Sequence, residues 1–106
     1  MDNKNLLKCC KAVLDFLNEE YYGEIPTPKQ NIMNNILIKN GWVTDIVLGG
    51  DMAGFTEYLN KRFQLGYSIE DEKGNMMNFF ENHSRNFYKT IIRDLTINEI
   101  IEDEVG

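Results

Sequence analysis

The stretch KNLLKCCKAVLDFLNEEYY, residues 4–22, decides the fold class of this chain. Its apolar side chains recur every three or four residues, at Leu6, Cys10, Val13, Leu14, Leu17 and Tyr21. That spacing is typical of one face of an α-helix, and lysines and Asp15 occupy another face. Gly23 follows as a stop signal. The stretch therefore predicts an amphipathic helix over residues 4–22.

A second helix is predicted to begin at Thr27 and to end at Asn40-Gly41. Thr27 suits the N-cap, and Pro28 suits the first helical position, where an amide hydrogen has no partner inside the helix. Residues 42–50 are ambiguous, because β-branched and aromatic residues lead into a glycine pair. They predict a helix or an extended loop, with a short strand as the alternative.

Three further helices are predicted in the C-terminal half. Asp51 is expected to cap the first of them. Asn75 is expected to cap a longer helix over residues 76–94. Thr96 and Glu99 fit the capping-box pattern S/T-x-x-E, which predicts that a short fifth helix begins there.

These elements predict a mostly α fold, a compact bundle of about five helices. The chain has 106 residues, which is too few for two independent cores. Its hydrophobic fraction of 42% is close to the average for folded proteins. We therefore expect residues 1–106 to form one small helical domain.

The two cysteines, Cys9 and Cys10, are adjacent in the sequence. Neighbouring residues on a helix point about 100° apart, so these thiols are poorly placed to bridge one another or to hold one ion together. We predict no disulfide framework, no metal site and no cofactor. One thiol is expected to be buried and the other to lie at the boundary of the core.

The sequence offers weak signs of catalysis. Residues 49–56 are arranged like a phosphate-binding loop, but Phe55 stands where a lysine must reach the phosphates. His83 is the only histidine, and its helical spacing predicts a core or boundary position. A general base also needs an orienting carboxylate and a nucleophile, and the adjacent Ser84 points elsewhere on the helix. We therefore predict that the chain is not an enzyme; a small enzyme using His83 is kept as an alternative.

The negative charge is concentrated in the C-terminal part of the chain. The formal net charge is -6; residues 67–106 carry 4 Lys/Arg and 9 Asp/Glu, against 7 and 8 in residues 1–66. Lysine and arginine supply most of the affinity for phosphate backbones and anionic membranes. The charge therefore predicts no direct nucleic-acid binding and no membrane binding, and it suits a protein partner with a basic surface. Without a signal peptide or an apolar span, a cytoplasmic location is expected.

The candidate site is a partner-binding surface made of two acidic runs and the single tryptophan. Its residues are Glu70, Asp71, Glu72, Glu99, Glu102, Asp103, Glu104 and Trp42. Carboxylates steer a basic partner toward the surface, and tryptophan is enriched at the centres of interfaces. The first hypothesis is a non-enzymatic protein-binding module that masks a basic, nucleic-acid-binding surface of its partner.

The size and charge are similar to those of phage anti-defence proteins, such as anti-CRISPRs, and of toxin-immunity proteins. No motif places the chain in either group, so the similarity is one of class. The second hypothesis is a regulatory or assembly subunit that forms a homodimer. Its basis is the apolar C-terminal segment around Ile97, Ile100 and Ile101, which is too short to be a stable helix alone and must dock on something.

Overall fold

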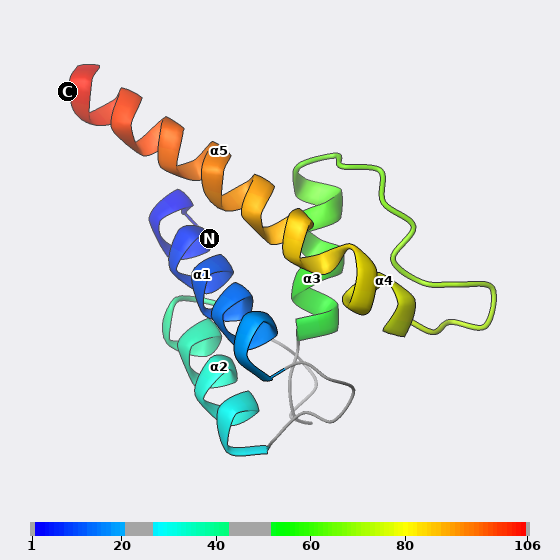
Figure 1. The fold of residues 1–106 in the computed structure, drawn as a ribbon. Helices are drawn as coiled ribbons and strands as arrows, with labels where there is room; N and C mark the ends of the chain where they lie inside the picture. Colours follow the sequence, from blue (N-terminus) through cyan, green and yellow to red (C-terminus); the bar gives the residue numbers. More distant parts are fainter. Residues whose placement is uncertain (1, 21–26, 43–51, 106) are drawn as a thin grey trace.

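The computed structural model describes residues 2–20, 27–42 and 52–105, and its description of side chains omits residues 20, 27 and 99–105. These ranges form five α-helices and no strand (Figure 1): α1 Asn3–Glu20, α2 Thr27–Lys39, α3 Met52–Arg62, α4 Met77–Asn82 and α5 Ser84–Val105. The predicted mostly α bundle is confirmed. Of the ambiguous segment 42–50, only Trp42 is described, and the predicted cap Asp51 also lies outside the described residues.

Helix α1 lies at the centre of the bundle, beside α2 and antiparallel to α5 (Figure 1). Because it has two neighbours, its buried face is wide: Leu6, Leu7, Cys9, Cys10, Val13, Phe16 and Leu17 are all buried. The prediction that one thiol lies at the boundary is therefore wrong, since Cys9 and Cys10 are both 0% exposed. The Sγ atom of Cys9 faces α2 and lies 4.0 Å from the carbonyl oxygen of Leu37.

Helix α2 ends in a turn at Gly41. Gly41 has φ +100°, a conformation that favours glycine. The amide of Gly41 donates to the carbonyl of Ile38 at 3.1 Å, and the amide of Trp42 donates to that of Leu37 at 2.9 Å. These two bonds form a Schellman motif, which ends the helix where the sequence predicted.

Helix α3 ends in the same motif without a glycine. The amide of Gln64 donates to the carbonyl of Lys61 at 3.3 Å, and the amide of Leu65 donates to that of Asn60 at 3.1 Å. Gln64 has φ +52°, and its side chain is exposed. A residue with a Cβ atom is strained in this left-handed region.

Replacing Gln64 by glycine is therefore expected to stabilise the protein by about 0.5–1 kcal/mol. The glycine relieves the left-handed strain, and the exposed glutamine side chain loses little packing. Urea unfolding at constant slope measures the change. Gln64→Ala is the control, because alanine keeps the strain; equal stability of the two variants would contradict the assignment of strain to this position.

The predicted helix over residues 76–94 is bent at His83, which separates α4 from α5. His83 has φ -125° and ψ -20°, although its amide still donates to the carbonyl of Phe79 and its carbonyl accepts from the amide of Phe87. Phe79 in α4 and Tyr88 in α5 lie on either side of the bend, and both are buried, at 3% and 0% exposed.

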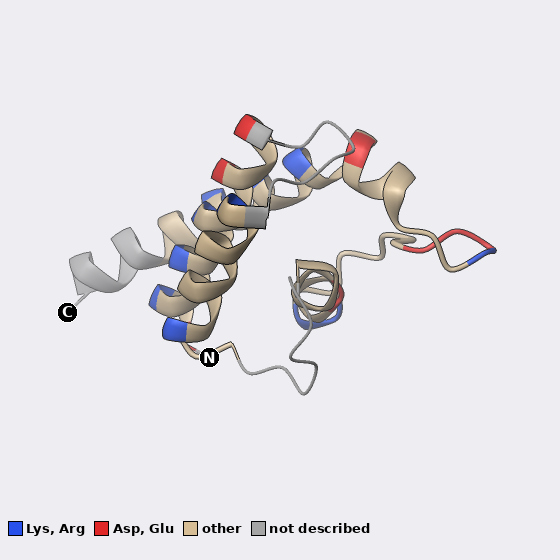
Figure 2. Ribbon diagram, turned by 90° about the horizontal axis from the view of Figure 1, so that it is seen from below, with Lys and Arg blue, Asp and Glu red and all other residues tan. Residues whose placement is uncertain are grey.

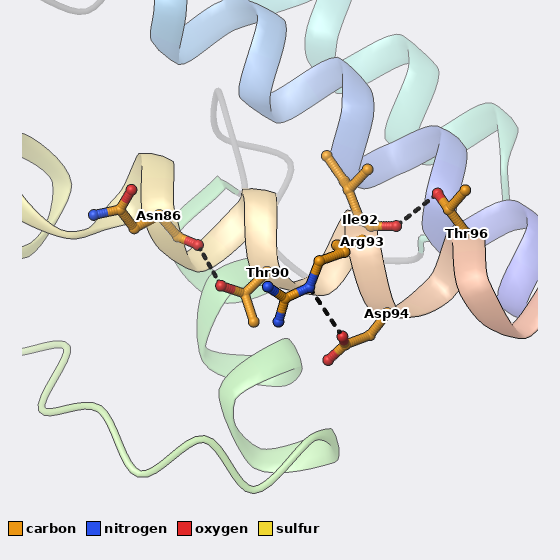
Figure 3. Close-up of polar contacts among 6 residues, drawn as sticks. All are labelled: Asn86, Thr90, Ile92, Arg93, Asp94 and Thr96. Carbon is orange, nitrogen blue, oxygen red and sulfur yellow. Dashed lines mark hydrogen bonds and ion pairs between the residues drawn. The ribbon is translucent and has the colours of Figure 1, made fainter.

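The predicted start of a separate helix at Thr96 is wrong, because α5 continues through this residue (Figure 3). The hydroxyl of Thr96 donates to the carbonyl of Ile92 at 2.7 Å. Thr90 makes the same bond to the carbonyl of Asn86 at 2.9 Å. A threonine hydroxyl that bonds the preceding turn sits inside a helix and does not cap the next one.

The buried side chains form one cluster, to which all five helices contribute. Tyr88 of α5 is fully buried, and its hydroxyl lies 2.7 Å from the hydroxyl of Thr56 in α3. Thr56 donates its own proton to the carbonyl of Met52 at 2.6 Å, so Tyr88 donates to Thr56. This buried bond fixes the position of α3 against α5.

Candidate partner-binding surface

The first acidic run lies in the segment between α3 and α4, and we call residues 70–75 the acidic turn. The carboxylate of Asp71 accepts hydrogen bonds from the amides of Lys73 at 2.9 Å and Asn75 at 2.8 Å. The side chain of Asn75 in turn accepts from the amide of Met77 at 3.0 Å. The N-cap of α4 is nevertheless Met76, one residue later than predicted, and its side chain makes no cap bond. Asp71 therefore holds the backbone of the turn in shape.

Glu70 and Glu72 are the exposed acidic residues on either side of Asp71. Figure 2 shows the acidic turn projecting from the helices as a red loop that ends in a blue segment. Lys73 supplies that positive charge. All three predicted residues of this run are exposed, and Asp71 in addition organises the loop through its carboxylate.

A shallow pocket of about 160 Å³ lies beside the acidic turn. Its lining comes from α3 and from the segment leading into the turn: Glu57, Asn60, Lys61, Tyr67, Ile69 and Glu70. Of these, the sequence singled out only Glu70. The other five were missed because nothing local in the sequence indicates that residues 67–70 fold back onto α3.

Trp42, the predicted aromatic anchor, packs within the chain. Its ring centroid lies 5.1 Å from that of Phe55 in an edge-to-face arrangement and 5.2 Å from that of Tyr58. The side chain is partly buried. The ring therefore joins the end of α2 to α3, and the acidic turn lies in a different part of the chain.

The second acidic run belongs to the last turns of α5. Glu99, Glu102, Asp103 and Glu104 lie within this helix, but their side chains are outside the described part. Just before them, Ile97 is 48% exposed. Figure 1 shows that the C-terminal end of α5 extends past the N-terminal end of α1.

His83 is exposed at the bend between α4 and α5, which corrects the predicted core or boundary position. Its ring centroid lies 6.3 Å from that of Phe79. The neighbouring Ser84 is buried and donates its hydroxyl proton to the carbonyl of Phe80 at 2.5 Å. These two side chains therefore do not form a base–nucleophile pair.

Within the described ranges, no three His, Cys, Asp or Glu side chains lie close enough to share a metal ion. The same ranges contain no helix with the length and apolar character of a membrane span.

Burial changes the acidity of the core thiols. It raises the pKa of Cys9 to about 11. It raises the pKa of Cys10 to about 12, with a further contribution from the neighbouring Cys9. Burial also raises the pKa of Tyr88 well above its ordinary value. Because a thiolate is the reactive form of cysteine, both thiols are poorly reactive at neutral pH in the folded protein.

The free energy of unfolding is therefore expected to fall as the pH rises above about 9, the ordinary pKa of these thiols. The unfolded chain loses its thiol protons there, whereas the folded chain keeps them up to about pH 11, so ionisation favours unfolding. Each thiol contributes up to about 1.4 kcal/mol per pH unit. Urea midpoints between about pH 8 and about pH 10.5 measure the slope. A Cys9→Ala/Cys10→Ala variant should show a flatter slope; an unchanged slope would contradict this origin.

Comparison of the chain with models of protein families, with curated proteins and with solved structures finds no match.

Proposed function

We propose that this protein is a non-enzymatic protein-binding module whose acidic turn contacts a basic surface of its partner. The observation that carries the proposal is the projecting turn, in which Asp71 fixes the backbone while Glu70 and Glu72 remain exposed. A loop that is ordered before binding loses less conformational entropy when it binds. Two exposed carboxylates beside each other also favour a positively charged partner and accelerate its approach.

In its sharper form, the proposal is an inhibitor that covers a nucleic-acid-binding surface of its partner. Such a surface is rich in lysine and arginine, and carboxylates can occupy the positions of phosphates. The small size and the net charge of -6 support this form. They are similar to those of phage anti-defence and toxin-immunity proteins. A cytoplasmic location of the protein itself belongs to the same proposal.

Affinity capture tests the role of the acidic turn. A Glu70→Lys/Glu72→Lys variant is expected to recover at least about tenfold less partner than the wild type at low salt, because two attractive charges become repulsive. Quantitative mass spectrometry of the captured proteins gives the ratio. The matched control is Asp15→Lys/Glu81→Lys, which makes the same charge change at exposed positions on α1 and α4. Equal losses in both variants would contradict a specific role for the turn.

One observation favours a second function, a homodimer assembled through α5. Ile97 is 48% exposed near the end of α5 that extends past α1 (Figure 1). A second copy could cover this side chain and the apolar residues that follow it in the sequence. Sedimentation equilibrium tests the homodimer. The wild type should be a dimer and the Ile97→Glu variant a monomer, and a wild-type monomer at roughly 50 μM would eliminate this function.

A further inference from the structure

From the pocket between α3 and the acidic turn, we infer that this protein binds an arginine side chain of its basic partner. This inference rests on the proposed function and names the group that the surface recognises. The pocket is lined by Glu57 and Glu70, which supply carboxylates, and by Tyr67, which supplies an aromatic ring. A guanidinium group bonds carboxylates through its planar array of donors and stacks on aromatic faces.

The pocket is built before any ligand arrives. The side chain of Asn60 in α3 donates to the carbonyl of Tyr67 at 2.9 Å and accepts from the amide of Tyr67 at 3.2 Å. Two residues later, Ile69 is buried at 6% exposed and belongs to the core cluster. These contacts fix the segment 67–69 against α3, so the pocket wall is held by the fold.

The size of the pocket selects the kind of ligand. Sites for small-molecule substrates and cofactors usually enclose about 300–1,000 Å³. A pocket of about 160 Å³ is too small for that class and suits the end of one side chain.

Charge adds to this selection. Lys61 also lines the pocket. The ionisable side chains of the lining therefore carry two negative charges, from Glu57 and Glu70, and one positive charge. The net negative charge favours a cation, and a guanidinium bonds carboxylates in a planar, bidentate arrangement that a compact ammonium cannot form.

Peptide titration followed by amide NMR tests the inference. The probe is acetyl-Gly-Gly-Arg-Gly-Gly-amide, and its matched control contains citrulline, which has the same shape without the charge. The arginine peptide should shift the amides of residues 57–61 and 67–70, with a Kd on the order of millimolar, and the citrulline peptide should not. Glu57→Gln should weaken binding by about fivefold or more, because Glu57 lines the pocket. Glu81→Gln should change it less than twofold, because Glu81 is an exposed carboxylate on α4, outside both the lining and the acidic turn.

The outcomes separate the pocket from the wider proposal. Equal effects of Glu57→Gln and Glu81→Gln, or equal binding of the arginine and citrulline peptides, would overturn the pocket as an arginine site. The proposed role of the acidic turn would not depend on that result. A specific arginine effect would support the pocket even if capture of the natural partner ignored the turn. Glu57 is only partly buried, so we expect Glu57→Gln to fold. An unchanged amide spectrum away from residues 57–70 checks this.

Discussion

Replacing Ile97 by proline is expected to destabilise the protein by about 3 kcal/mol or more and to reduce its helical circular dichroism. The residue lies inside α5, where the helix runs from Ser84 to Val105. Proline there removes a backbone hydrogen bond and clashes with the preceding turn, which contains the buried Leu95. Thermal unfolding and far-ultraviolet circular dichroism measure the two effects.

The same substitution distinguishes this continuous helix from the arrangement that the capping-box pattern predicted. If a new helix began after Thr96, position 97 would be its first residue, where proline is well tolerated. Ile97→Ala is the control, since it removes the exposed side chain without disturbing the backbone. A proline variant as stable and as helical as the alanine variant would show that α5 is interrupted at Thr96.

Replacing Phe87 by alanine is expected to cost about 3–5 kcal/mol, which is close to the whole stability of many small domains. Phe87 is 0% exposed, and its ring lies edge-to-face against the rings of Tyr67, Phe79 and Tyr88. The substitution leaves a cavity where α4, α5 and the segment before the acidic turn meet. Urea unfolding gives the loss.

The aromatic contact also links the core to the candidate surface, because Tyr67 lines the pocket. The Phe87→Ala variant should therefore show faster amide hydrogen exchange in residues 67–70 as well as lower global stability. Phe63→Ala is the comparison: Phe63 is only partly buried, so its loss should cost about 1–2 kcal/mol. Similar costs for both substitutions would contradict the central position of Phe87.

The sequence predicted the helices whose signals are local and agree with one another. Residues 4–20 carry one apolar stripe, while the predicted stop signal at Gly23 lies outside the described residues. Helix α2 has proline at its start and glycine after its end. Thr96 was misread because a threonine followed by Glu99 fits both a cap and the interior of a helix. The hydroxyl bond to Ile92 decides between them, and it depends on a turn that the pattern does not define.

The bend at His83 was missed for a different reason. The aromatic residues on both sides of it fit a broad helical stripe in the sequence. Only the structure shows that the backbone leaves the helical conformation at His83, where φ is -125°.

The candidate surface was predictable in composition and not in geometry. The acidic run at Glu70 to Glu72 is visible as a charged turn, but the inward bonds of Asp71 are not. The pocket depends on Asn60 bonding the backbone of Tyr67, a contact between residues that no periodicity connects. Trp42 was selected by residue type, and its packing on α3 follows from the turn after α2.

We propose that exposed carboxylates of the acidic turn draw a basic partner onto this surface. The most direct measurement is the rate constant for association with the captured partner as a function of salt, for the wild type and for Glu70→Lys/Glu72→Lys. We predict that the wild-type rate falls at least about tenfold between roughly 0.05 and 0.5 M salt, and that the variant is slower at low salt and nearly independent of salt. Rates that are equal for both proteins and unaffected by salt would contradict the account.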